Sequence, residues 1–201
     1  MLLRTTVVSV LGASILTPGA AHAAPVAPGG PIAFAVLAHG GNGCPKGSLS
    51  TSTADDGAVL TAGFTKLRAS VADRRTADCQ LALEVTHPAG WTYGLRRARV
   101  EGIADVDQVG GGKITLQASH QGAGTASRLS SDVKNTIGAW RVTDEFPNVV
   151  YAECGAARAL QLRVTLAASS GASGGEPTPV AYLAAGTATV SAADLVWKKC
   201  D

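Results

Sequence analysis

Leu160-Gln161-Leu162-Arg163-Val164-Thr165-Leu166 is the stretch that decides the fold. Apolar and polar side chains alternate strictly along it. Because successive side chains of a β-strand point to opposite faces, this pattern predicts a strand with one buried and one wet face. The same alternation recurs at residues 81–86 and 114–119. Strands of this kind are typical of antiparallel sheets, so the sequence predicts an all-β protein.

Turn signals divide the chain into about nine or ten short strands. Asp55-Asp56-Gly57 predicts a hairpin between two such strands. Gly110-Gly111-Gly112 is expected to end a long segment that begins near residue 93, and Phe146-Pro147-Asn148 to precede a strand at 149–154. We predict a single antiparallel β-sandwich, with a closed β-barrel as the alternative.

The composition bounds the class of protein. The 201 residues fit one domain, and 46% of them are hydrophobic but only 4% aromatic. Aromatic side chains bury the most area per residue, so this core is thin and favours covalent cross-links. The formal net charge is only +2. A near-neutral domain lacks the charge that nucleic acids and anionic membranes attract.

Residues 1–23 have the three parts of a signal peptide. A short basic region ending at Arg4 precedes an apolar stretch, 5–16, that is too short to span a bilayer. Ala21-His22-Ala23 then offers a small-residue cleavage site. We therefore expect a leader with a possible first strand at 24–40, a β domain at 41–201, and a secreted, extracellular product with no membrane contact in its mature form.

The cysteines predict two disulfides. Cys44, Cys79, Cys154 and Cys200 form no C-x-x-C motif, which speaks against the usual zinc and thioredoxin spacings. An even number of cysteines in an exported chain predicts disulfide bonds. Four cysteines allow three pairings, and spacing alone does not choose among them. We predict the sequential pairing, Cys44–Cys79 and Cys154–Cys200.

Several short blocks carry a family resemblance. The most specific is Gly41-Asn42-Gly43-Cys44-Pro45-Lys46-Gly47-Ser48. The others, in order, are Asp55-Asp56-Gly57, Asp73-Arg74-Arg75, Cys79-Gln80-Leu81, Pro88-Ala89-Gly90, Glu101-Gly102-Ile103-Ala104, Glu153-Cys154-Gly155 and Val196-Trp197-Lys198-Lys199-Cys200. In order and spacing this set resembles the DUF4360 family, small secreted proteins of unknown function from actinomycetes and fungi. Glu101 stands where the family pattern usually has Arg. The resemblance implies an exported, disulfide-bonded single domain and carries over no catalytic residue.

Trp91 and Tyr93 are candidate ligand-binding residues. They lie two positions apart after a predicted turn, so on a strand they would face the same side. Two exposed rings could stack on sugars, because the apolar faces of sugars bury well against aromatic rings. The competing interpretation, that both rings are core residues, is favoured by the usual burial of large apolar side chains.

Arg97 and Arg99 are the second candidate pair. They would project from one strand face, with Arg96 on the other. Guanidinium groups bind sulfate, phosphate or acidic sugars well. Positive charge also protects exposed sheet edges from aggregation, and the sequence favours that role for these residues.

Catalytic patterns are weak. A glycosidase needs two carboxylates roughly 5–9 Å apart, and the available ones are Glu84, Glu101, Asp105 and Asp107. Residues 171–175 match G-x-S-x-G, but within a Ser/Gly/Pro loop that lacks the strand-to-helix context of a nucleophile elbow. No histidine pairs with another ligand type at metal-binding spacing, so no metal or cofactor is predicted.

The leading hypothesis is therefore a secreted, non-enzymatic protein that binds an extracellular surface or polymer. Its expected partner is a polysaccharide or a protein, and the chain itself is expected to be a monomer. A secreted hydrolase that uses paired carboxylates is the alternative. A defence factor that acts on another organism's protein is a third hypothesis, and its sign would be a large exposed apolar patch.

Overall fold

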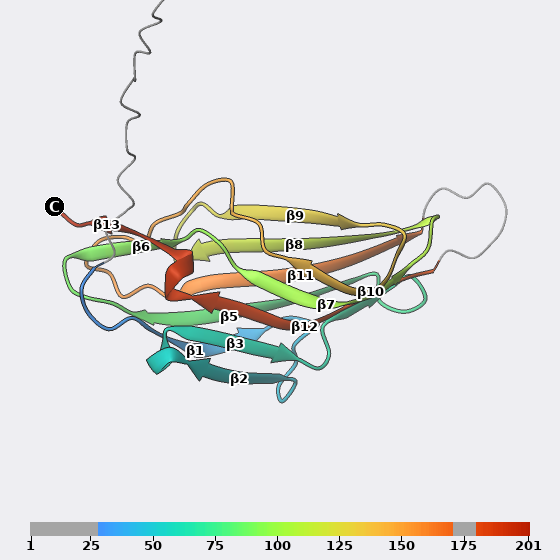
Figure 1. The fold of residues 1–201 in the computed structure, drawn as a ribbon, viewed down its shortest axis with the longest axis horizontal. Coiled ribbons are helices and arrows are strands. Elements are labelled where there is room, and N and C mark those ends of the chain that lie inside the picture. Colours follow the sequence, from blue (N-terminus) through green and yellow to red (C-terminus); the bar gives the residue numbers. More distant parts are fainter. Residues whose placement is uncertain (1–27, 171–179) are drawn as a thin grey trace, which may run out of the picture.

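The computed structural model describes residues 28–170 and 180–201. These residues form thirteen strands and two short 3-10 turns, and every strand pairing is antiparallel (Figure 1). The all-β prediction is confirmed, with more strands than the nine or ten expected. The predicted signal peptide at 1–23 and the G-x-S-x-G match at 171–175 lie outside the described residues.

The strands form two large sheets and one small one. The five-stranded sheet contains, in spatial order, β1 (Ala33–Gly40), β5 (Thr76–Thr86), β11 (Leu160–Ser170), β8 (Gly110–His120) and β9 (Ser127–Val133). The six-stranded sheet contains β10 (Thr136–Val142), β7 (Arg99–Val106), β12 (Ala181–Ser191), β3 (Val59–Phe64) and β2 (Leu49–Ala54), with β4 (Arg68–Ser70) paired to β12. A small sheet of β6 (Trp91–Leu95) and β13 (Leu195–Lys199) extends one end (Figure 1). The architecture is the predicted sandwich rather than a closed barrel.

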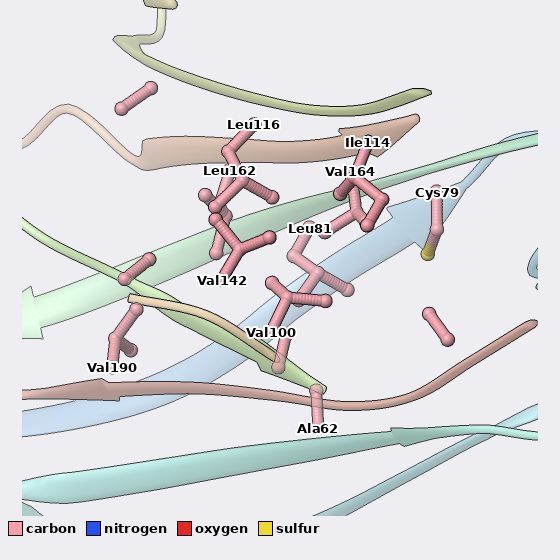
Figure 2. Close-up of a cluster of buried hydrophobic side chains, with 14 of the residues drawn as sticks. Ala62, Cys79, Leu81, Val100, Ile114, Leu116, Val142, Leu162, Val164 and Val190 are labelled. Carbon is pink, nitrogen blue, oxygen red and sulfur yellow. The ribbon is translucent and has the colours of Figure 1, made fainter. Parts of the chain in front are cut away.

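The hydrophobic core lies between the two large sheets (Figure 2). Leu81, Leu116 and Leu162 enter it from the five-stranded sheet, and Val100 and Val190 enter it from the six-stranded sheet. Each is at most 2% exposed, and burying a side chain of this size contributes about 1.5–3 kcal/mol. The predicted alternation is confirmed in β5, β8 and β11. Their polar residues consequently share the outer face of the five-stranded sheet.

The hairpin at the 3-10 turn Asp55–Gly57 is confirmed, since it joins β2 to β3. Two other expectations are wrong. The segment that begins near residue 93 is two strands, β6 and β7, in different sheets. Residues 149–154 form no strand: Tyr151 makes only an isolated bridge to Gly94, and Ala152 N–H donates to the Tyr93 carbonyl at 2.9 Å, so the segment contacts β6 without forming a continuous ladder.

The glycine run at 110–112 is a strand, not the predicted turn, because it opens β8. At Gly112, a Cβ would lie 2.8 Å from a methyl carbon of Leu183 in the opposite sheet. The missing side chain therefore makes room for sheet-to-sheet packing, a use of glycine that its turn propensity does not reveal.

The two disulfides join Cys44 to Cys79 and Cys154 to Cys200, which is the sequential pairing. Cys44 and Cys79 are buried in the core, whereas Cys154 is exposed. Within residues 28–170 and 180–201, no helix is long and apolar enough to cross a membrane.

Candidate functional site

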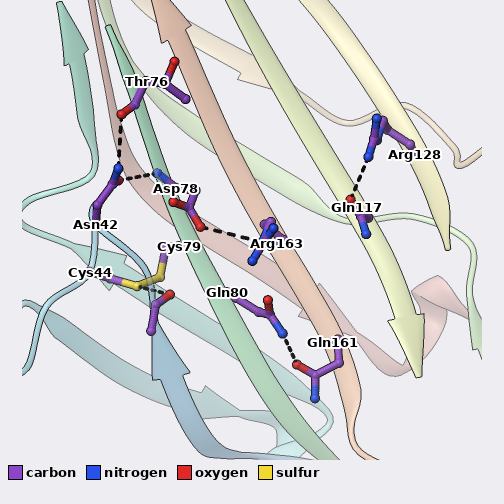
Figure 3. A network of polar contacts seen from close by, with 11 residues as sticks. Asn42, Cys44, Thr76, Asp78, Cys79, Gln80, Gln117, Arg128, Gln161 and Arg163 are labelled. Atoms are coloured by element: carbon purple, nitrogen blue, oxygen red, sulfur yellow. Dashed lines mark hydrogen bonds and ion pairs between the residues drawn. A yellow bond between two sulfur atoms is a disulfide. The ribbon is translucent and has the colours of Figure 1, made fainter. Parts of the chain in front are cut away.

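A row of four polar side chains crosses the outer face of the five-stranded sheet. Gln80 of β5 pairs in register with Arg163 of β11, Arg163 with Gln117 of β8, and Gln117 with Arg128 of β9. We call these four residues the polar row (Figure 3). It spans three inter-strand spacings of roughly 4.8 Å, or about 14 Å. The row therefore aligns amide and guanidinium groups along one straight line across four strands.

Side-chain contacts hold the polar row in place. Nε2 of Gln80 donates to Oε1 of Gln161 at 2.6 Å, and Nη2 of Arg128 donates to Oε1 of Gln117 at 3.1 Å (Figure 3). Nε of Arg163 lies 3.6 Å from the Asp78 carboxylate. Each such contact uses only part of the hydrogen-bonding capacity of an amide or guanidinium. The row consequently keeps donors and acceptors that an external ligand can use.

Shallow hollows accompany the polar row. One of about 300 Å³ lies between the end of β1 and the row, and one of about 180 Å³ lies over the row itself. Both are lined by Gln80, Gln161 and Arg163, so they adjoin. A larger hollow of about 470 Å³ lies farther along β5, where Glu84 and Leu37 contribute to its lining. The five-stranded sheet thus offers a series of depressions along β5 and not one deep cavity.

The first cysteine block fixes β5 beside the polar row. The Asn42 side chain accepts from the Asp78 N–H at 2.9 Å and donates to the Thr76 carbonyl at 3.3 Å (Figure 3). Gly43 N–H donates to the Asp78 carbonyl at 2.8 Å, and the disulfide of Cys44 follows directly. These contacts give the most specific sequence block a structural role. Its successive residues Asn42, Gly43 and Cys44 attach to β5 through a side chain, a backbone N–H and a disulfide, respectively.

Trp91 and Tyr93 do not form an exposed stacking surface. Tyr93 is 2% exposed, its hydroxyl donates to the Arg158 carbonyl at 3.3 Å, and its burial raises its pKa to about 12. Trp91 is half-buried and packs against the core. The Tyr93 ring lies 5.1 Å from that of His120 and 5.9 Å from that of Trp197, so other side chains occupy the space around it. The candidate role of Tyr93 as an exposed stacking ring is therefore wrong.

Arg97 and Arg99 lie on the other side of the sandwich and line one hollow of about 360 Å³. Nε of Arg97 lies 2.9 Å from the Asp194 carboxylate, and this hydrogen bond raises the pKa of Arg97. Nε of Arg99 lies 3.9 Å from Glu101. The structure brings the two arginines together but keeps them apart from the polar row. Their role in binding stays a prediction.

The four candidate carboxylates do not converge. Glu84 lies on the five-stranded sheet, whereas Glu101 and Asp105 lie four residues apart on β7 of the other sheet, roughly 13 Å along the strand. The Asp107 carboxylate accepts the backbone N–H groups of Val180, Gly110 and Val109, and these bonds lower its pKa. Asp105 lies only two residues from Asp107, but both oxygens of Asp107 accept these backbone bonds, which ties that carboxylate to the loop around it. The remaining carboxylates are too far apart for the pair that the hydrolase hypothesis requires.

The sequence interpretation missed the polar row. Its members occupy polar positions of strands that were predicted correctly, and the alternation in those strands was the available signal. The alternation shows which face a side chain occupies, but the alignment of four strands depends on long-range register.

Together these features define a disulfide-linked antiparallel β-sandwich with a polar outer sheet face. The chain belongs to the family described as "Domain of unknown function (DUF4360)", whose model matches residues 31–200. A structure described as TmCBM61 in complex with β-1,4-galactotriose is similar at 14% identity and a TM-score of 0.35, covering 81% of this chain and 87% of that one. No curated protein matches the chain by sequence.

Proposed function

We propose that this protein binds an extracellular polysaccharide through the outer face of its five-stranded sheet, without acting on it chemically. The observation that carries the proposal is the in-register polar row, Gln80, Arg163, Gln117 and Arg128. Sugar hydroxyls both donate and accept hydrogen bonds, and amides and guanidinium groups supply the matching partners.

The shape of this face favours an extended ligand. The hollows beside the row are shallow and follow one another along β5, so they suit a chain that lies across the surface. A row of about 14 Å can contact more than one sugar unit. The rigid sheet and the Cys44–Cys79 disulfide hold the side chains in place before binding, which lowers the entropic cost of association.

The test is retention of the oxidised protein, starting at residue 24, on insoluble cellulose, chitin and purified cell wall. A site variant, Gln80→Ala with Arg163→Ala, is compared with a matched control, Gln108→Ala with Arg141→Ala. The control removes the same two side-chain types from exposed positions outside the polar row. Thermal unfolding checks that both variants remain folded.

We expect wild type and control to be retained on at least one polymer, and the site variant to lose retention at least tenfold. That loss corresponds to about 1.4 kcal/mol, the scale of one or two hydrogen bonds. Equal retention of the folded site variant and the control would place binding elsewhere, and no retention of wild type on any polymer would contradict a polysaccharide ligand.

A further inference from the structure

A further polar hollow, of about 260 Å³, lies near the beginning of β5. Its charged lining residues are Lys66, Arg68, Asp73 and Arg74, and all four are exposed. We call this depression the basic hollow. Three positive groups against one carboxylate give it a net positive charge, in a protein whose total formal charge is only +2.

Among the described residues, no ion pair neutralises the cations of the basic hollow. Seven ion pairs occur among residues 28–170 and 180–201, and none of them includes Lys66, Arg68 or Arg74. By contrast, Arg97 and Arg163 each face a carboxylate. The basic hollow therefore collects unpaired positive charge, which favours binding of an anion.

The backbone around the basic hollow is held in a defined arrangement. Ser70 N–H donates to the Arg74 carbonyl at 2.7 Å, closing the turn between Ser70 and Arg74. Nη1 of Arg74 donates to the Asn42 carbonyl at 2.6 Å. β4 fixes Arg68 by pairing it with Ala184 of β12. The guanidinium groups are thus carried by ordered backbone on two sides of one depression.

The basic hollow is linked to the polar row through a short chain of contacts. Asn42, which also lines the hollow, bonds to the Asp78 backbone, and the Asp78 side chain pairs with Arg163 of the row. A polymer that crosses the row and follows β5 toward its first residue would therefore reach the hollow.

We propose that the basic hollow is an anion-binding subsite, and that the polymer bound by the sheet carries carboxylate, sulfate or phosphate groups. The second half of this statement rests on the proposed function, whereas the first half does not. Lys66, Arg68 and Arg74 would contact one acidic group, while the polar row would contact uncharged hydroxyls.

The first experiment tests the hollow alone, with inorganic sulfate and inorganic phosphate titrated into ¹⁵N-labelled protein at constant ionic strength. Wild type is compared with Lys66→Gln/Arg68→Gln and with a control, Lys198→Gln/Lys199→Gln, which removes the same charge from exposed positions elsewhere. Arg74 is left unchanged because it bonds to the Asn42 backbone. We expect saturable shifts of the amides at 66–74 in wild type and control and at least tenfold weaker binding in the hollow variant. Anion binding that is weakened equally in the hollow variant and the control, or the absence of a saturable shift in wild type, would contradict the proposal that the basic hollow binds an anion.

The second experiment uses two pairs of polymers that share a sugar backbone, one member charged and the other neutral: polygalacturonate against its fully methyl-esterified form, and dextran sulfate against dextran. We expect the charged member of at least one pair to bind at least tenfold tighter, and Lys66→Gln/Arg68→Gln to abolish that preference. The pair that responds distinguishes carboxylate from sulfate. Equal binding of the charged and neutral members of both pairs would contradict the proposal that the bound polymer is acidic. If Gln80→Ala/Arg163→Ala binds both members of each pair as tightly as wild type does, the polar row is refuted and the anion-binding subsite stands.

Discussion

The two disulfides close loops of similar length but hold different kinds of structure. Cys44–Cys79 spans 35 residues and lies in the core, whereas Cys154–Cys200 spans 46 residues and Cys154 is exposed. Chain entropy alone would assign each bond about 4 kcal/mol. A difference between their contributions to the free energy of unfolding would therefore come from the packing around each disulfide, and not from the length of its loop.

The two disulfides also differ in the structure that surrounds them. Beside Cys44, the chain contacts β5 through hydrogen bonds of Asn42 and Gly43, and the polar row begins at the residue after Cys79. At the end that holds Cys154, Tyr93 of β6 and Trp197 of β13 pack against His87 and His120, with ring centroids 5.1 to 6.0 Å apart. The first disulfide supports the candidate site, and the second supports the end of the sandwich that the β6–β13 sheet extends.

The largest expected effect comes from removing the first disulfide. Cys44→Ala/Cys79→Ala should lower the free energy of unfolding by about 5 kcal/mol, because it loses the cross-link and also leaves a cavity in the core. Cys154→Ala/Cys200→Ala should lower it by about 3 kcal/mol, since Cys154 is exposed. Urea unfolding under non-reducing conditions measures both values.

The same variants separate the two regions functionally. At temperatures where both remain folded, the Cys44→Ala/Cys79→Ala variant should bind polymer more weakly, and the Cys154→Ala/Cys200→Ala variant should bind like wild type. Equal losses of stability and of binding would show that the two disulfides are equivalent, which contradicts the comparison.

Two glycines beside these cysteines give a smaller, matched contrast. Gly41 has φ +125°, and a Cβ there would overlap the Asp78 carbonyl oxygen; Gly155 has φ +74° and open space around it. Gly41→Ala should therefore cost about 3 kcal/mol, from backbone strain plus the forced movement of β5. Gly155→Ala should cost about 1 kcal/mol, from the left-handed backbone alone. Thermal or urea unfolding measures both losses of stability. Similar losses would mean that the backbone at Gly41 can move to accommodate a Cβ.

The sequence predicted the sandwich better than its site, for a physical reason. The alternation in β5, β8 and β11 depends only on neighbouring residues, so the buried face of each could be identified. Glycine could not be interpreted in the same way: Gly112 makes room for Leu183, and that contact exists only after two sheets have packed together.

The candidate site depends even more on long-range structure. Gln80 and Arg163 are 83 residues apart in sequence, and their alignment follows from the pairing of β5 with β11. The aromatic hypothesis failed at Tyr93 for a related reason, since the groups around its side chain, His120, Trp197 and the Arg158 carbonyl, come from distant parts of the chain. Local pattern identified strand faces, but it did not identify which other segment covers or lines them.

The smallest expected effect is a pH dependence at the end that holds Cys154. His120 is 3% exposed and its ring lies 5.1 Å from that of Tyr93. Its Nε2 faces the Val150 carbonyl at 3.1 Å, and because a carbonyl only accepts, Nε2 carries the proton of the neutral ring. Nδ1 has no hydrogen-bond partner among the described residues, so protonating it would place an unsatisfied donor in the core.

Burial accordingly lowers the pKa of His120 below 6.5, and the hydrogen bond to Val150 opposes this only in part. A histidine with a lowered folded-state pKa contributes its full stability above its unfolded pKa of about 6.5 and loses it as the pH falls from there toward the folded value. Urea unfolding of wild type between pH 7.5 and 5.5 should show this decline. His120→Phe, which keeps a ring but cannot titrate, should show a flatter profile. Parallel profiles would mean that His120 can leave the core or find a partner when protonated, and this end of the sandwich would then be looser than its ring contacts indicate.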